Sequence, residues 1–113
     1  MITQELRLKK ATDFSKVYKF GKSYNHTELY IKSLKSGYKT SKFAVVIPKK
    51  VTKLAVKRNR ARRRVYEILR INQPNMTSGY NIIITLKSDL SSLTPKQLTD
   101  ILLQGLNKLE VIT

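Results

Sequence analysis

A cluster of arginines dominates the middle of the sequence. The segment AVKRNRARRRVYEILR, residues 55–70, holds seven Lys or Arg side chains and a single carboxylate, Glu67. Each arginine presents a planar fork of N–H donors that matches phosphate oxygens, and each phosphate neutralised by a cation releases counterions. The chemistry that this cluster can do is therefore the binding of a polyanion.

Side chains that could catalyse hydrolysis by themselves are sparse. Unaided cleavage of RNA or DNA needs a general acid with a general base, or carboxylates that hold a divalent metal. His26 is the only histidine, there is no cysteine, and the four glycines form no phosphate-binding loop. Five further acidic residues stand singly, without metal-ligand spacing: Asp13, Glu28, Asp89, Asp100 and Glu110. We predict a binding subunit with no catalytic residue and no metal site of its own.

The arginine cluster is predicted to lie on one helix, from about residue 53 to 71. At 100° per residue, five apolar side chains fall in one stripe that could dock on a sheet: Leu54, Ala61, Val65, Ile68 and Leu69. Like charges at i and i+4 each destabilise such a helix by roughly 0.2–0.5 kcal/mol, and a face that is merely solvated would mix the two signs. We therefore expect an external polyanion to complete the helix.

The flanking segments predict the elements that position this helix. A short helix is expected over 12–20, with Thr12 as its N-cap and Gly21 as its stop. Alternating runs at 29–34 and 42–48 predict a hairpin that turns at Gly37, and residues 22–26 offer a weaker extra strand.

Two further elements complete the chain. The apolar run YNIIITL, 80–86, predicts a buried strand that could pair in parallel with 42–47 through a helical crossover. Thr94, Pro95 and Gln97 form a capping box that starts a last helix. The predicted fold is α+β, a small mixed sheet of three to four strands packed with three helices in the order α-β-β-(β)-α-β-α. We expect one domain over 1–113, with residues 1–10 as a basic N-terminal arm.

The net charge of +16 is concentrated in one part of the sequence. Residues 1–70 hold 20 basic and 4 acidic side chains, whereas residues 71–113 hold 3 of each. Such a field attracts polyanions, so nucleic acid is the leading partner class, ahead of an anionic membrane or an acidic protein. No apolar run reaches 18 residues and the first residues lack a secretion signal, so we expect a cytoplasmic protein.

A strip of aromatic residues offers a second nucleic-acid contact. Phe14, Tyr18 and Tyr30, with Lys10 and Lys32 nearby in the pattern, could stack unpaired bases, each worth roughly 1–3 kcal/mol. The alternative is that Phe14 and Tyr18 pack the first helix onto the sheet, and the pattern alone favours neither. Tyr30 lies on the strand face opposite the apolar residues, so it need not serve the same core.

The segment KKVTKLAVKRNRARRR, residues 49–64, resembles the signature of the protein subunit of bacterial ribonuclease P. Paired lysines, a spacer, Ala-Val and then Arg-Asn-Arg with further basic residues all match. Upstream, LKKATDFSKVYKFGKS resembles the first helix of that family, and the likeness extends from about residue 6 to residue 109, weakening after residue 71.

The resemblance implies a left-handed crossover between the parallel strands, where right-handed crossovers are the general rule. It also implies an activity: the holoenzyme removes the 5′ leader of precursor tRNA by hydrolysis that requires Mg²⁺, and a large RNA is the catalyst. The partners would be that catalytic RNA, which would bind most of the Mg²⁺, and precursor tRNA. No membrane and no obligate protein partner is expected.

The resemblance also implies two sets of binding residues. The set that would contact the RNA subunit is Lys49, Lys50, Lys53, Lys57, Arg58, Asn59, Arg60, Arg62 and Arg63. The set that would line a cleft for the single-stranded leader is Lys10, Phe14, Tyr18, Tyr30 and Lys32.

Two positions depart from the family pattern. Tyr66 stands where arginine is common, so a phosphate contact would be lost or replaced by stacking, and Lys32 stands where an aromatic residue is common. The rival interpretation is a ribosomal or general RNA-binding protein with no processing role, which the segment at 49–63 disfavours. A helix lying on a membrane is disfavoured because the apolar stripe is narrow and the chain has no tryptophan.

Overall fold

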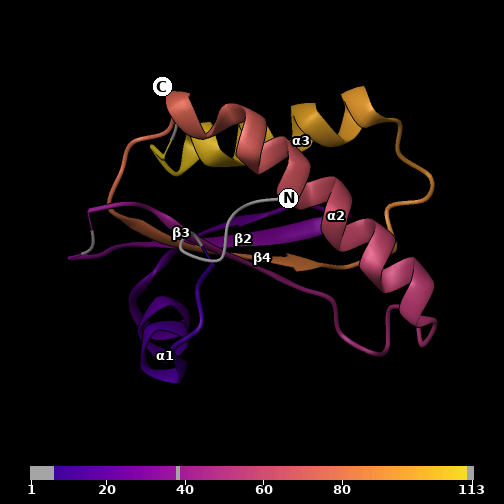
Figure 1. The fold of residues 1–113 in the computed structure, drawn as a ribbon, viewed down its shortest axis with the longest axis horizontal. Helices are drawn as coiled ribbons and strands as arrows, with labels where there is room; N and C mark the ends of the chain where they lie inside the picture. Colours follow the sequence, from indigo (N-terminus) through magenta and orange to yellow (C-terminus); the bar gives the residue numbers. More distant parts are fainter. Residues whose placement is uncertain (1–6, 38, 112–113) are drawn as a thin grey trace.

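The computed structural model describes residues 7–37 and 39–111. Its elements, in chain order, are α1 (Ala11–Phe20), β1 (Lys22–Asn25), β2 (Leu29–Lys35), β3 (Lys42–Val46), α2 (Ala55–Asn72), the short 3₁₀ helix η2 (Gln73–Asn75), β4 (Tyr80–Leu86) and α3 (Pro95–Lys108). The strands form one mixed sheet in the order β1-β2-β4-β3. Helices α2 and α3 cover one face of it, and α1 lies on the other (Figure 1). The predicted α+β class and element order are confirmed.

The predicted hairpin between 29–34 and 42–48 is wrong. Strand β4 lies between these two segments, antiparallel to β2 and parallel to β3. The hairpin partner of β2 is instead β1, the strand with the weak pattern. The physical reason is that β4 is buried on both faces, with Ile82 and Ile84 in one core and Ile83 in the other, so this strand lies in the interior of the sheet. A turn glycine alone does not choose a partner.

The crossover from β3 through α2 to β4 is left-handed, as the resemblance implied. The carbonyl of Phe43 accepts a hydrogen bond from the backbone N–H of Leu8, at 2.7 Å, on the edge of β3 that faces away from β4. The Phe43 side chain lies in the core shared with α2. In a strand of L-residues, the direction of the Phe43 carbonyl and that of the Phe43 side chain together fix the side on which β4 lies. When the sheet is viewed from α2 with β3 running upward, β4 lies to the left of β3, and this is the left-handed arrangement. Right-handed crossovers are the usual form, so the hand is distinctive.

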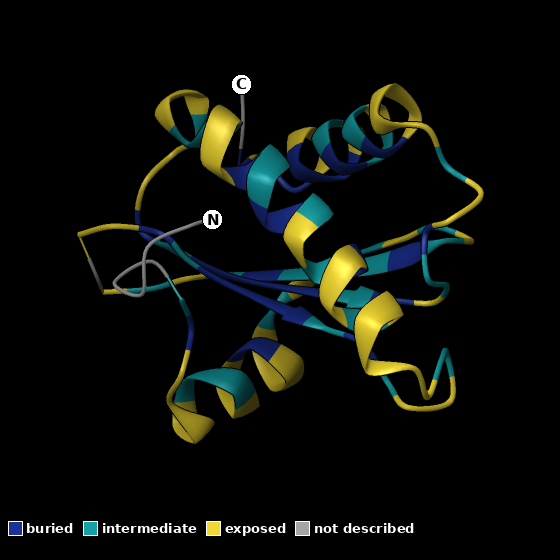
Figure 2. Ribbon diagram, turned by 45° about the vertical axis from the view of Figure 1, so that its right-hand side comes forward, coloured by how far each residue is buried: buried dark blue, intermediate teal, exposed yellow. Residues whose placement is uncertain are grey.

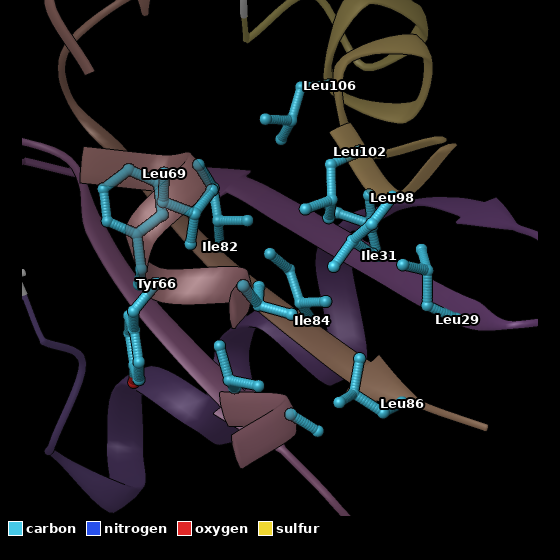
Figure 3. Close-up of a cluster of buried hydrophobic side chains, with 14 of the residues drawn as sticks. Leu29, Ile31, Tyr66, Leu69, Ile82, Ile84, Leu86, Leu98, Leu102 and Leu106 are labelled. Carbon is cyan, nitrogen blue, oxygen red and sulfur yellow. The ribbon is translucent and has the colours of Figure 1, made fainter. Parts of the chain in front are cut away.

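Each face of the sheet has its own core. On the α2 and α3 side, Ile82 and Ile84 of β4 pack with Leu69, Leu98 and Leu102 in the larger cluster (Figure 3). Beneath α1, a smaller cluster of buried residues is made by Leu8, Val17, Ala44 and Ile83. Each buried aliphatic side chain contributes roughly 1.5–3 kcal/mol of transfer free energy. The sheet is therefore a fixed platform for the helices on both faces.

The helix ends predicted from local sequence signals are partly correct. As predicted, Thr94 caps α3: its hydroxyl accepts from Gln97 N at 3.1 Å, and Gln97 Oε1 accepts from Thr94 N at 2.9 Å. The N-cap of α1 is Lys10 and not Thr12, which lies inside the first turn, and no side chain caps this helix. Gly21 follows the last residue of α1 as expected, and glycine fits there because a Cβ would lie 2.4 Å from the carbonyl oxygen of Val17.

Candidate nucleic-acid interface

Helix α2 has a buried side and a cationic side. Ala61, Val65 and Leu69 of the predicted stripe are buried, and Tyr66 joins them at 5% exposure. Leu54 was placed in this stripe wrongly: it is 59% exposed, because it precedes the helix and the first turns of α2 are open to solvent (Figure 2). The exposed start of α2 therefore presents its charges outward.

The structure brings the predicted RNA-subunit residues together at this exposed end. They come from the loop between β3 and α2 and from the first turns of α2. The exposed members are Lys49, Lys50, Lys53, Lys57, Asn59, Arg60 and Arg63, and the half-buried ones are Arg58 and Arg62. Arg58 donates from Nη2 to the carbonyl of Ile47 at 3.4 Å, and Arg62 donates from Nη1 to Asn59 Oδ1 at 3.0 Å.

Few of these charges are neutralised by other residues that the structure describes. Lys57 Nζ lies 3.8 Å from Asp89 Oδ2, and the pKa of Asp89 is lowered, first by the hydroxyl and backbone N–H of Ser91 and then by Lys57. Arg60 and Arg63 have no carboxylate partner within 7–37 and 39–111. The first turn of α2 holds no acidic residue either. The surface therefore keeps a positive potential that an anion can use.

Two arginines outside the predicted sets have clear tasks. Arg64 donates from Nη1 to the carbonyl of Leu90 and from Nη2 to that of Leu93, both at 2.7 Å, so it ties α2 to the loop before α3. Arg7 places its guanidinium carbon 5.1 Å from the ring centroid of Tyr66. Sequence reasoning missed both because each contact joins segments far apart in the chain.

The predicted stacking of RNA on Tyr66 finds no support in the fold. The Tyr66 ring is buried against the larger core, and Arg7 lies over it. A base cannot reach a ring that is covered in this way. Tyr66 therefore contacts the cationic surface through the Arg7 guanidinium.

The predicted leader residues divide into different environments. Phe14 is half-buried against the smaller core, so it packs α1 onto the sheet, whereas Tyr18 is 45% exposed and Lys10 is exposed. Lys32 donates from Nζ to the carbonyl of Tyr18 at 2.6 Å, at the C-terminal end of α1 where a cation stabilises the helix dipole. Lys32 therefore already has a structural partner.

Tyr30 lies at a different place from Tyr18. It lines a hollow of about 500 Å³ at the end of the sheet where β4 finishes, and Lys50, Thr85 and Lys87 line the same hollow. Lys50 belongs to the predicted RNA-subunit set and Tyr30 to the leader set. The two predicted surfaces therefore meet at this hollow.

Within the described residues, no group of three or more His, Cys, Asp or Glu side chains is placed to hold a metal ion. No helix found in that part of the chain is both long enough and apolar enough to cross a membrane.

Comparisons with known proteins agree with this architecture. A family model for ribonuclease P matches residues 2–110. The ribonuclease P protein component of Pseudanabaena sp. (strain PCC 6903) is 34% identical over 99% of this chain and 97% of its own. That of Alkaliphilus oremlandii is 34% identical over 94% of this chain and 92% of its own.

Solved structures show the same fold. The RNase P protein from Thermotoga maritima, in complex with 1-(4-fluorophenyl)-2-thiourea, is 28% identical, covers 95% of this chain and 100% of its own, and superposes with a TM-score of 0.79. The Staphylococcus aureus RNase P protein, at 22% identity, has a TM-score of 0.84 over 96% of this chain and 98% of its own. Since the family model spans nearly the whole sequence and the curated relatives align over nearly their full length, this chain belongs to the ribonuclease P protein family.

Proposed function

We propose that this chain is the protein subunit of a ribonuclease P holoenzyme, which matures tRNA by removing the 5′ leader of the precursor. One observation supports this assignment beyond family membership. The exposed turns of α2 collect Arg60, Arg63 and Lys57 on one surface, with Asp89 as the only carboxylate paired to them among the described residues. A surface of this kind binds RNA phosphates and serves no purpose in packing.

The two partners use two surfaces in this proposal. The loop at 49–53 and the start of α2 bind the RNA subunit through their lysines and arginines. The leader of precursor tRNA lies along the opposite face of the sheet, where Tyr18 and Tyr30 are open to stack bases and Lys10 contributes charge. Phe14 packs against the smaller core and so holds α1 on this face of the sheet.

The chemical step belongs to the RNA in this proposal. His26 accepts a hydrogen bond on Nδ1 from Glu28 N at 3.0 Å, and its ring meets no carboxylate among the described residues that would make it half of an acid and base pair. Mg²⁺, which the hydrolysis requires, would be held mainly by RNA phosphates, since the cationic surface of α2 repels it. The protein contributes binding energy and position.

Reconstitution tests this assignment directly. A bacterial ribonuclease P RNA is mixed with precursor tRNA at a low magnesium concentration where the RNA alone cleaves poorly. Adding this protein is expected to restore removal of the leader. Tight binding to the RNA with no gain in cleavage would contradict the proposal and favour a general RNA-binding protein instead.

Two variants separate the surfaces. Arg60→Ala is expected to weaken association with the RNA subunit, and Tyr18→Ala to weaken the preference for leader-bearing over mature tRNA. Lys108→Ala, an exposed cation on α3, serves as the matched control and is expected to change neither step. Equal loss of one and the same step in both variants would overturn the division into two surfaces.

A further inference from the structure

A second hollow, beside the start of α2, is built from two separate parts of the chain. Arg7, which precedes α1, lines it together with Val56, Asn59, Arg62 and Arg63 of α2, and it encloses about 500 Å³. Every charged side chain in this lining is an arginine. The potential inside is therefore positive, and the hollow favours an anion.

Arg7 is fixed in this hollow by both its backbone and its side chain. Its backbone forms a parallel bridge to Phe43 at the edge of β3, and the next residue, Leu8, is buried and donates to the Phe43 carbonyl. The guanidinium lies over the Tyr66 ring at a distance within the range of cation–π attraction. Tyr66 is itself packed in the core. The position of Arg7 is thus set before any partner arrives.

The Arg7 guanidinium keeps a donor that no described residue uses. Its Nε is enclosed and finds no hydrogen-bond acceptor among the described residues. No carboxylate in that part of the chain pairs with Arg7. A planar cation held on an aromatic ring and facing Arg62 and Arg63 is arranged for an oxyanion, because the fork of N–H groups matches two oxygens of one phosphate.

We propose that Arg7, Arg62 and Arg63 form a binding site for a backbone phosphate of the ribonuclease P RNA. The inference rests on the proposed function and deepens it, since it extends the RNA-subunit surface beyond α2 to the segment that precedes α1. Tyr66 is a positioning residue in this site: it does not touch RNA and holds the guanidinium of Arg7 in place.

Substitutions at Arg7 test the site by equilibrium binding to a bacterial ribonuclease P RNA between 50 and 200 mM KCl. Arg7→Ala is expected to weaken binding about tenfold, and to make the slope of log affinity against log salt shallower by roughly 0.7–0.9, the share of one phosphate. Arg7→Lys keeps the charge but loses the planar fork, so the slope is expected to hold while affinity falls. Lys108→Ala removes one charge from α3 and is expected to leave the slope unchanged.

Substitutions at Tyr66 test the positioning. Tyr66→Phe keeps the ring and is expected to bind as the unmodified chain does, whereas Tyr66→Leu removes the platform. In the Tyr66→Leu background, Arg7→Ala is expected to have a smaller effect than in the unmodified chain. Circular dichroism and urea unfolding confirm that each variant is folded, and Arg7→Gln replaces Arg7→Ala if the shorter side chain loosens the bridge to β3.

The outcomes separate this inference from the proposed function. If Arg7→Ala and Arg7→Gln bind with unchanged affinity and slope while Arg60→Ala weakens binding, the Arg7 site is wrong and the RNA-binding role of α2 stands. Equal effects of Arg7→Ala in the Tyr66→Leu and unmodified backgrounds would refute the role of Tyr66. Failure of the unmodified chain to bind the RNA would overturn the proposed function itself.

Discussion

Arg60 and Arg64 stand one helical turn apart on α2 and have opposite tasks. Arg64 is half-buried, and its guanidinium donates hydrogen bonds to the carbonyls of Leu90 and Leu93, whereas Arg60 is exposed. Leu90 adopts a positive φ of 64°, which a non-glycine residue keeps only when neighbouring contacts hold it. The hydrogen bonds from Arg64 are therefore part of what fixes the loop before α3.

The difference predicts opposite phenotypes. Arg64→Ala is expected to lower the free energy of unfolding by about 2 kcal/mol, because two carbonyls lose charged hydrogen-bond donors. Arg60→Ala is expected to leave stability within about 0.5 kcal/mol and to weaken RNA binding. Urea unfolding and RNA titration of both variants check this. A stable Arg64→Ala protein would show that the loop is held by other contacts.

Asp89 gives stability a dependence on pH. Its pKa is lowered in the folded chain, chiefly by hydrogen bonds from Ser91 and also by Lys57. A lowered pKa means that the contribution of Asp89 is fully present above the unfolded pKa, near 4, and is lost as pH falls through the lower folded value. We expect Asp89→Asn to reduce stability at pH 7 and to flatten its fall below about pH 4. Unfolding measurements from pH 7 to pH 2.5 give the pH dependence of stability for the unmodified chain and for Asp89→Asn. Parallel curves would contradict this role of Asp89.

At the scale of elements, α3 approaches the sheet closely at Gly105. A Cβ at this position would lie 2.7 Å from Ile31 Cδ1 and 2.7 Å from the Tyr24 ring. Alanine is a better helix former than glycine by about 1 kcal/mol, but overpacking a close contact costs about 1–3 kcal/mol. Contact between α3 and the sheet therefore outweighs helix propensity at this residue.

Gly105→Ala is accordingly expected to destabilise the chain by about 1 kcal/mol, since the steric cost exceeds the gain in propensity. Gly37→Ala is the matched control, because no atom lies within 4 Å of a Cβ built there. Thermal unfolding of the two variants gives the comparison. A raised melting temperature for Gly105→Ala would mean that Tyr24 and Ile31 move aside at little cost.

The elements also show what could be predicted from the sequence and what could not. The start of α3 was predicted correctly because a capping box lies within four residues and needs no distant partner. The strand order was not, because it depends on which strand is buried on both faces, a property of the whole fold. Likewise, Lys32 could not be assigned to the end of α1 from its place in β2 alone. Local signals fix elements, and long-range packing decides the residues that the elements bring together.

At the scale of the whole molecule, repulsion between the cations opposes folding of the free chain, and binding of RNA relieves it. The chain carries a net charge of +16, all of it from the first 70 residues. On α2 these cations repel one another across the buried stripe that anchors the helix to the sheet. Salt screens repulsion between exposed charges, and it also screens their attraction to phosphate. The same ions therefore have opposite effects on the free protein and on the complex.

Between 50 and 200 mM KCl, we expect the stability of the free chain and its affinity for RNA to change in opposite directions. The free energy of unfolding of the chain alone is expected to rise as repulsion is screened. The affinity for structured RNA is expected to fall with a log–log slope of roughly −0.7 to −0.9 for each phosphate contacted. Urea unfolding and RNA titration in the same buffers measure the pair. An affinity that stayed flat across this range would mean that the arginines of α2 do not contact RNA phosphates, because each neutralised phosphate must add to the salt slope.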